Sequence, residues 1–231
     1  MRKLMQKIIG FVCLFQITIA VLANPGLQGE GVVKAEDIAV VIGASYAQSW
    51  NVDRLDGLKV VNAGVDGQQS FELLERFQHD VLDRKPRMVV IWGYINDIHR
   101  NPRDKIDQTK QRAKDSFIKM VELAQQNDVI PVLATEVTIR PPDGWKETVM
   151  GWIGDLRGKQ GYQAYVNQHV SQLNIWLRRY AAENGLRLLD FEPLLAGKDG
   201  VRLERFATPD GTHINAAAYK RLSEYTQTQL R

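Results

Sequence analysis

Short, continuously apolar runs alternate along this chain with longer segments of mixed polarity, and this alternation restricts the fold more than any other feature. Such runs are typical of strands covered on both faces, as in a parallel sheet. Parallel neighbours need crossover connections, which the mixed segments can supply as helices. We therefore predict an α/β fold, a three-layer α/β/α sandwich around a five-stranded parallel sheet. The predicted strands are 38–42, 58–61, 88–92, 129–133 and 186–190.

Apolar residues recur at helical spacing in the segments between these strands. We predict that Ser70 caps the start of the first long helix and that Gly185 ends the third. The segment 136–161 interrupts the alternation, is long for a plain loop, and contains Trp145 and Trp152. It is interpreted either as a lid or substrate wall, or as a surface excursion with buried tryptophans. The predicted helices are 70–85, 104–126, 162–184 and 215–230.

Residues 1–23 have the pattern of a secretory signal peptide. Arg2, Lys3 and Lys7 form a basic start, and residues 8–23 form an apolar run that is short for a membrane span. An uncleaved anchor helix is the alternative interpretation. We expect an exported protein, periplasmic or extracellular, with no stable membrane insertion once the signal is cleaved.

The remaining sequence is predicted to hold a linker, 24–36, and a single domain, 37–231, with the insertion 136–161. Cys13 is the only cysteine and lies within the signal, so the mature domain would have no disulfide, thiol nucleophile or cysteine metal ligand. The net charge of +3 also comes from the signal, because the other lysines and arginines equal the 27 aspartates and glutamates. Charge therefore gives no indication of nucleic-acid binding.

Several candidate residues follow predicted strands, where ligand crevices form in open α/β sheets. Ser45, Gly64 and Asn96 follow the first three strands, and each also has an ordinary explanation as a helix cap, a turn glycine or an Asx turn. Asp210 and His213 precede the last helix, at a spacing that also occurs in solvated loops. A serine, a histidine held by a carboxylate, and donors for an oxyanion are together the parts of nucleophilic acyl transfer.

Other sites are less favoured by the sequence. Ser45 lacks the second glycine of a Gly-x-Ser-x-Gly elbow, which disfavours the α/β-hydrolase fold, and no phosphate-binding loop is present. His79 and His169 fall within amphipathic helices, where solvated or packing roles are expected. His99 follows Asn96 closely and could line the site.

The ordered set Ser45, Gly64, Asn96 and Asp210-Gly-Thr-His213 resembles the SGNH hydrolase superfamily, the GDSL-like esterases, lipases and acylhydrolases, over nearly the whole mature domain. The resemblance implies a flavodoxin-like fold with Ser45 as nucleophile and His213 as general base, oriented by Asp210. It implies an oxyanion hole made by the backbone N–H groups of Ser45 and Gly64 and the side chain of Asn96. No metal or organic cofactor is implied.

Two positions depart from the family pattern. Ala44 stands where the family usually has aspartate, a position outside the proton relay, so activity is expected to survive. Tyr94 stands where glycine is usual, with Gly93 one residue early, and is expected to affect the shape of the acyl site. The candidate pocket residues are Tyr46, Tyr94, Trp145 and Trp152.

The favoured interpretation is an exported serine ester hydrolase that forms an acyl-enzyme from a small ester or an acylated glycan. One alternative is an envelope polysaccharide O-acetyltransferase, in which the same residues use a sugar hydroxyl as acceptor. The other is a glycan-binding module that has kept the fold without catalysis. Nucleic acid is not an expected partner.

Overall fold

A computed structural model describes residues 36–141 and 161–230 of the chain. The predicted signal peptide, all but the last residue of the linker, and most of the insertion, including Trp145 and Trp152, lie outside the described residues. The described part forms an α/β structure with one six-stranded sheet in the order β2-β3-β1-β4-β5-β6. The strands are β1 (Glu36–Gly43), β2 (Arg54–Leu55), β3 (Leu58–Gly64), β4 (Pro86–Trp92), β5 (Ile130–Ala134) and β6 (Arg187–Leu189).

The five predicted strands are confirmed as the parallel part of this sheet. Their order, β3-β1-β4-β5-β6, is that of flavodoxin-like sheets, which confirms the predicted fold. The prediction of five strands needs one correction, because the short β2 pairs antiparallel with β3 at the sheet edge. Asp56 and Gly57 join these two strands with positive φ angles of 51° and 76°, the backbone of a tight two-residue hairpin.

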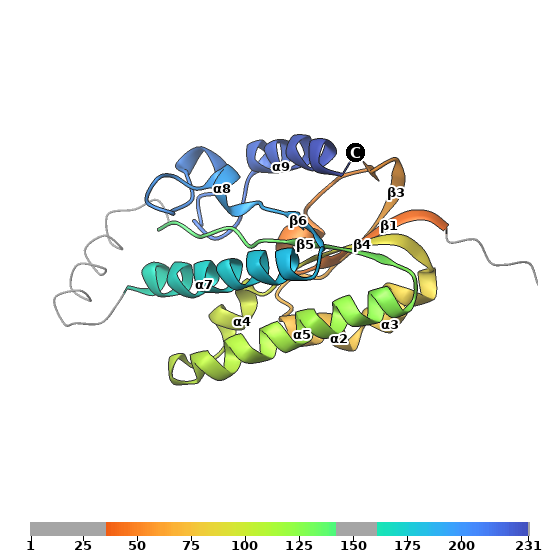
Figure 1. Ribbon diagram of the computed structural model, residues 1–231. Helices are drawn as coiled ribbons and strands as arrows, with labels where there is room; N and C mark the ends of the chain where they lie inside the picture. Colours follow the sequence, from red (N-terminus) through yellow and green to blue (C-terminus); the bar gives the residue numbers. More distant parts are fainter. Residues whose placement is uncertain (1–35, 142–160, 231) are drawn as a thin grey trace, which may run out of the picture. The chain divides into compact units, whose positions relative to one another are not determined.

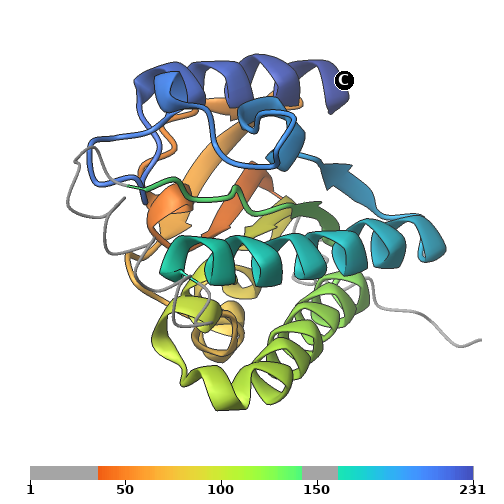
Figure 2. The ribbon, with the colours of Figure 1, turned by 90° about the vertical axis from the view of Figure 1, so that its left-hand side faces the viewer.

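Helices cover both faces of the sheet, with α9 on one face and α2 and α5 on the other (Figure 1). Seen from the side, α7 runs beside the sheet on the face that carries α5 (Figure 2). The α-helices are α1 (Ser45–Gln48), α2 (Ser70–Glu75), α3 (Phe77–Asp80), α4 (Ile95–Arg100), α5 (Ile106–Gln126), α7 (Tyr162–Glu183), α8 (Glu192–Leu195) and α9 (Ala216–Gln229). Single 3₁₀ turns are η1 (Leu82–Arg84), η2 (Arg103–Lys105) and η3 (Glu204–Phe206). No helix among the described residues is long and apolar enough to cross a membrane.

The predicted helix 70–85 is wrong in its continuity, since it is divided into α2, α3 and η1. The break falls at Arg76, whose backbone leaves helical geometry with φ −97° and ψ 3°. Its guanidinium donates to the Gly43 carbonyl (3.1 Å) and to Gln68 Oε1 (2.6 Å), so the chain bends toward the end of β1. Lys85, with φ 49°, then ends the last turn before the strand.

The start of α2 is at Ser70 as predicted, but the cap is made by other residues. Gln69 is the N-cap, and its backbone N–H donates to Glu72 Oε2 (2.8 Å) in a capping box. The Ser70 hydroxyl instead donates to Asp97 Oδ1 (2.8 Å), which ties α2 to α4. Gly185 has a φ of 62° just past α7, as predicted for a left-handed helix end.

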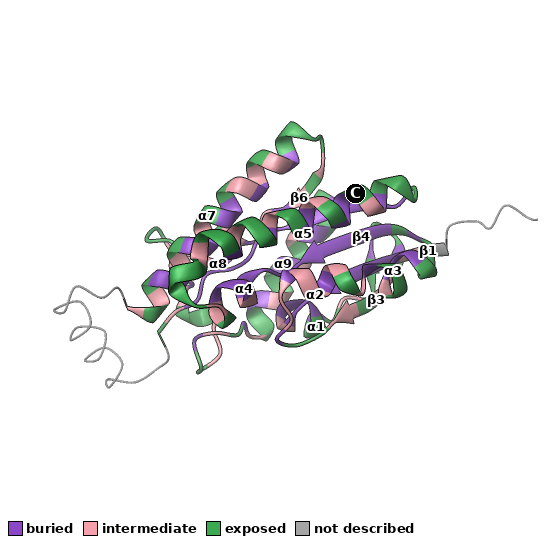
Figure 3. Cartoon of the chain, turned by 90° about the horizontal axis from the view of Figure 1, so that it is seen from below, coloured by how far each residue is buried: buried purple, intermediate pink, exposed green. Residues whose placement is uncertain are grey.

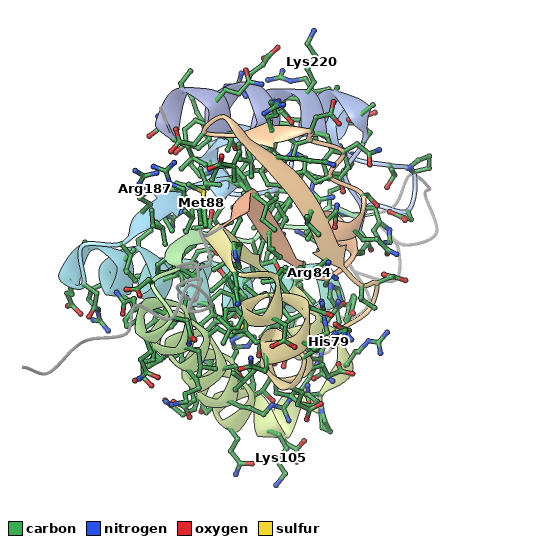
Figure 4. All side chains as sticks on the ribbon, turned by 90° about the vertical axis from the view of Figure 1, so that its right-hand side faces the viewer. His79, Arg84, Met88, Lys105, Arg187 and Lys220 are labelled. Atoms are coloured by element: carbon green, nitrogen blue, oxygen red, sulfur yellow. The ribbon has the colours of Figure 1, made fainter. Side chains whose placement is uncertain are left out.

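The core lies between the sheet and its helices. Figure 3 shows purple strands beneath helices whose outer surfaces are green, the pattern expected of amphipathic helices on a doubly covered sheet. Val40 and Val89, in the middle of β1 and β4, are fully buried. Figure 4 shows Lys105 and Lys220 projecting outward on opposite sides of the molecule, which leaves the apolar interior free of their charges.

Candidate active site

The ends of β3, β1 and β4 lie side by side and carry three of the predicted site residues. The strands are parallel, and their register pairs Gly43 of β1 with Gly64 of β3 and Trp92 of β4. Ser45 follows β1 at the start of α1, and Asn96 follows β4 in the first turn of α4. The neighbours of β1 on either side are reached by connections that leave in opposite directions, which is where open α/β sheets form their crevice.

Two glycines let α1 pack directly on these strand ends. A Cβ atom on Gly43 would lie 2.6 Å from the Ala47 Cβ of α1, and one on Gly64 would lie 2.1 Å from the Gln48 backbone nitrogen. Both distances are far below van der Waals contact, so any side chain would displace the helix. The glycines therefore set how closely Ser45 approaches the neighbouring strands.

Ser45 is the first residue of α1, while the N-cap is Ala44 with no side-chain capping bond. The ordinary explanation of Ser45 as a helix cap therefore does not apply. Its hydroxyl-bearing side chain is half-buried. Its backbone N–H lies in the first helical turn, where N–H groups have no acceptor within the helix.

Asn62, just before Gly64, fastens the other end of α1. Its amide nitrogen donates to the Ala47 carbonyl oxygen (2.8 Å), and its Oδ1 accepts the Gly64 backbone N–H (2.8 Å). One side chain thus holds the short helix to the end of β3. The N–H of Gly64, a predicted oxyanion donor, is occupied by this contact.

Asn96 lies beside the same strand ends. Its Nδ2 donates to the Gln68 carbonyl oxygen (3.0 Å), and an amide nitrogen carries a second hydrogen. The next residue, Asp97, is fully buried and accepts the backbone N–H and the hydroxyl of Ser70, both at 2.8 Å. Burial raises the pKa of Asp97 to about 6, against the lowering effect of the Ser70 hydrogen bonds. Through its two hydrogen bonds with Ser70, Asp97 anchors the turn that carries Asn96.

Asp210 and His213 form the contact that their spacing predicted. Asp210 Oδ2 lies 2.7 Å from His213 Nδ1, and Oδ1 accepts the backbone N–H groups of Thr212 (2.7 Å) and His213 (2.9 Å). The Thr208 hydroxyl also donates to Oδ1, at 2.8 Å. Partial burial acts to raise the pKa of Asp210, but the hydrogen bonds from His213, Thr208 and Thr212 outweigh it and hold this pKa well below its ordinary value. The carboxylate is therefore ionised at neutral pH and selects the His213 tautomer with hydrogen on Nδ1.

The loop that carries this pair contacts Tyr46, the residue that follows Ser45. The Tyr46 hydroxyl donates to the Thr212 carbonyl oxygen (2.6 Å), and its ring meets the His213 imidazole edge-on with centroids 6.4 Å apart. Figure 2 shows the orange α1 and the blue segment before α9 on the same side of the molecule. The loop also receives the backbone N–H of Arg140 on the Gly211 carbonyl (3.0 Å), so the insertion begins beside it.

The predicted pocket residues are placed as follows. Tyr46 is only 3% exposed and lies beneath the His213 loop. Tyr94 is 2% exposed, with its ring against Phe117 and its hydroxyl hydrogen-bonded to Asn174 Oδ1, so its side chain lies in the core. The two predicted tryptophans are among the residues that the structure leaves undescribed.

Glu136 is a buried residue near the site that sequence reasoning missed. Its Oε1 accepts the backbone N–H groups of Tyr94 (2.9 Å) and Ile95 (3.2 Å), which fixes the start of α4. Burial raises the pKa of Glu136 to about 7, although these backbone hydrogen bonds act in the opposite direction. A lone glutamate after an apolar strand carried no signal for this role.

The other histidines have distinct surroundings. His99 follows Asn96 by three residues on α4, bonds through Nδ1 to the Tyr162 hydroxyl, and has its pKa lowered to about 4 by burial and then by the nearby His213. His79 projects from α3 into solvent (Figure 4), and its side chain is 83% exposed. His169 is 8% exposed and packs against Tyr165. Across residues 36–141 and 161–230, no three histidine, cysteine, aspartate or glutamate side chains come together as metal ligands would.

Comparison with known proteins identifies one relative among curated sequences. The chain is 28% identical over 151 residues to YqeF, an uncharacterized lipoprotein of Bacillus subtilis, in a match that covers 58% of this chain and 59% of YqeF. The chain thus spans less than two thirds of that relative's length.

Solved structures give the same fold. A protein of the G-D-S-L lipolytic family from Desulfitobacterium hafniense has a TM-score of 0.64 and 25% identity, covering 84% of this chain and all of its own. A GDSL-like lipase from Bacteroides thetaiotaomicron, at 21% identity, has a TM-score of 0.65 over 86% of this chain and 89% of its own. The profile of the GDSL-like Lipase/Acylhydrolase family matches residues 41–221, which include every predicted catalytic and oxyanion residue. The chain belongs to the GDSL-like lipase/acylhydrolase family.

Proposed function

We propose that this protein is an exported serine ester hydrolase in which Ser45 is the nucleophile, His213 the general base and Asp210 the residue that orients His213. The observation that carries the proposal is the Asp210–His213 contact of 2.7 Å, on a loop that hydrogen-bonds to Tyr46, the residue next to Ser45. Asp210 accepts the Nδ1 hydrogen, so the lone pair of Nε2 is left to accept a proton. That is the tautomer a general base needs.

The reaction follows from these roles. Ser45 Oγ attacks the ester carbonyl carbon as its proton passes to His213 Nε2, and the tetrahedral intermediate collapses when that proton passes to the departing alcohol. Water then attacks the acyl-enzyme, giving its proton to His213. Collapse of the second intermediate returns the proton to Ser45 and releases the carboxylic acid. No electron transfer is involved, and His213 ends as it began.

The oxyanion would be stabilised by donors at the strand ends. The Ser45 backbone N–H and the second amide hydrogen of Asn96 are suited to this, and one such donor is worth about 3 kcal/mol of barrier. The Gly64 N–H donates to Asn62 Oδ1 and would have to turn from it to take part. We therefore assign the hole first to Ser45 and Asn96, with Gly64 joining when substrate binds.

Export and the class of substrate are parts of the same proposal. The signal-like pattern of residues 1–23 and the likeness to a lipoprotein support export. The half-exposed Asp210 and His213 side chains, at 52% and 48%, suit a substrate that approaches from solvent, such as a small ester or an acylated glycan.

The test uses purified protein with p-nitrophenyl esters of graded acyl length and a fluorophosphonate probe. Ser45→Ala should lower kcat/KM by at least about 10³-fold and abolish labelling, because the other groups cannot replace the nucleophile. Ser116→Ala is the matched control, since its hydroxyl bonds to the Arg112 carbonyl within α5 (2.9 Å), away from the strand ends. Equal activity of the Ser45→Ala variant and the unaltered protein would contradict the proposal.

A further inference from the structure

A buried arginine lies directly beneath the His213 loop. Arg202 is 2% exposed, and among the described residues it forms no ion pair with a carboxylate. It is held by a small hairpin after α8, in which Gly197 N–H donates to the Val201 carbonyl (2.8 Å) and Leu203 N–H donates to the Leu195 carbonyl (2.9 Å). A buried guanidinium is costly unless its donors are used, so the use of those donors indicates its role.

All the hydrogen bonds of this guanidinium go to the loop or to α1. Nη1 donates to the carbonyl oxygens of Thr212 (2.8 Å) and His213 (2.6 Å), and Nη2 donates to the Tyr46 hydroxyl oxygen (2.6 Å). The same Tyr46 hydroxyl donates to the Thr212 carbonyl (2.6 Å). One planar group therefore holds both the backbone of His213 and the residue that follows Ser45.

Tyr46 is a fixed partner for this arginine. Burial raises the pKa of Tyr46 to about 12, although the nearby Arg202 acts to lower it, so the hydroxyl keeps the hydrogen that it donates to Thr212. Its ring lies 5.6 Å from that of Trp92, at the end of β4. The Tyr219 hydroxyl of α9 also donates to the Tyr46 carbonyl (3.1 Å). Arg202 is thus joined, through Tyr46, to the rigid end of the sheet.

Burial of the functional side chains does little to fix this loop to the rest of the domain. Asp210 and His213 are each about half exposed, so their burial contributes only part of what fixes the loop. The antiparallel bridge between Ala207 and Ile214 closes the loop at its base, and the Thr208 backbone N–H donates to the His213 carbonyl (3.1 Å) just inside it. The two carbonyls that Arg202 binds belong to Thr212 and His213, which directly precede Ile214, so Arg202 holds the arm of the loop that carries the His213 side chain.

We propose that Arg202 is a positioning residue that sets the place of His213 relative to Ser45, an inference that rests on the proposed function. It acts on the backbone of the base, and it touches neither substrate nor reacting atoms. Arginine suits this place because its two terminal nitrogens reach three acceptors, with only the buried Nε left without a partner, whereas an ammonium group cannot meet all three in fixed directions.

The experiment compares Arg202→Met, Arg202→Lys and Tyr46→Phe in the full protein, with Arg178→Met as control. Arg178 also makes three side-chain hydrogen bonds, two to Asp190 (2.7 and 2.9 Å) and one to Glu192 (2.8 Å), but none of them goes to the loop or to α1. The readouts are kcat and KM for p-nitrophenyl acetate, the rate of fluorophosphonate labelling, and the melting temperature of each variant.

Misplacement of a catalytic group by about 1 Å can cost about 10²-fold, so Arg202→Met should lower kcat about 100-fold while KM stays nearly constant. Labelling should slow in parallel, because it needs the same base. Arg202→Lys should recover part of the loss, and Tyr46→Phe should lower kcat about 10-fold with little change in melting temperature, because only one link of the bridge is removed. Arg178→Met should lower the melting temperature and leave kcat unchanged.

A merely structural role would give a different result. If Arg202→Met lowered the melting temperature as Arg178→Met does but kept kcat within a few-fold, the positioning role would be overturned. Should Arg202→Met fail to fold, Tyr46→Phe decides alone, and an unchanged kcat there would also overturn it. If the unaltered protein neither cleaves esters nor reacts with the probe, the proposed function itself fails. That result is distinct from failure of the Arg202 inference, which is read only from the variants.

Discussion

Replacing Asp210 by asparagine should be more harmful to catalysis than replacing it by alanine, although asparagine resembles aspartate more closely. Asp210 uses Oδ1 to accept two backbone N–H groups, from Thr212 and His213, and uses Oδ2 to accept the imidazole hydrogen of His213. An asparagine amide has one acceptor and one donor end. If its oxygen keeps the backbone bonds, its NH₂ group faces His213 Nδ1 and forces the hydrogen onto Nε2, where it blocks proton transfer from Ser45.

The reverse orientation of Asn in place of Asp210 keeps the useful tautomer but turns the NH₂ group toward two N–H donors. Each unmet bond costs about 1–3 kcal/mol, and the 52% exposure of Asp210 favours the lower end, so the penalty is about 2 kcal/mol, or roughly 30-fold in population. Loss of the carboxylate beside an imidazolium adds up to about 1 kcal/mol at such an exposed site, roughly 5-fold. Asp210→Asn should therefore lower kcat by about 10²-fold.

Alanine at position 210 removes the carboxylate without adding a competing donor. Because the site is half open, water can accept the Nδ1 hydrogen of His213, and we expect kcat to fall only about 10-fold. The assay is steady-state hydrolysis of p-nitrophenyl acetate at pH 8, with labelling rates and melting temperatures measured for both variants. An Asp210→Asn variant as active as Asp210→Ala, or more active, at equal stability would refute the tautomer argument.

Two further predictions concern the frame of the site. Gly64→Ala should prevent native folding or greatly lower the melting temperature, because its Cβ would meet the Gln48 backbone at 2.1 Å; wild-type thermal unfolding in this variant would show that α1 can move away. The unaltered protein should lose stability as the pH rises from about 4.5 to about 7, and Glu136→Gln should remove this loss. Burial raises the Glu136 pKa from 4.5 to about 7, so the folded state holds a proton that the unfolded chain has released between these values, and stability falls across that window by up to about 3 kcal/mol. Urea unfolding at pH 5 and pH 8 should show a smaller difference for Glu136→Gln than for the unaltered protein, and equal differences would exclude Glu136 as the cause.

Local pattern was sufficient for the parts of the fold that depend on nearby residues. The apolar runs predicted all five parallel strands, and the spacing of Asp210 and His213 predicted a contact that forms within one loop. The Asp56-Gly57 hairpin also has a local signal, because an Asp-Gly pair is typical of two-residue turns with positive φ.

Features that depend on distant partners could not be predicted from pattern. Helix 70–85 breaks because Arg76 binds Gly43, and Ser70 turns from capping to bind Asp97, 27 residues away. The roles of Glu136 and Arg202 could not be predicted for the same reason. Glu136 binds Tyr94, 42 residues away, and Arg202 binds Tyr46, 156 residues away. A single buried charge has no period or motif, and its role appears only when the fold brings its partners together.

We expect the bridge from Arg202 to Tyr46, and with it the site, to form late in folding. α1 is a four-residue helix, far below the length at which a helix is stable alone, and the loop that faces it comes from the other end of the domain. Contacts between such distant segments form slowly, because a long loop must close before they can stabilise the chain. During refolding, circular dichroism should therefore recover before the proposed esterase activity does. A chain that has regained its helices and sheet but not this closure would look folded and remain inert.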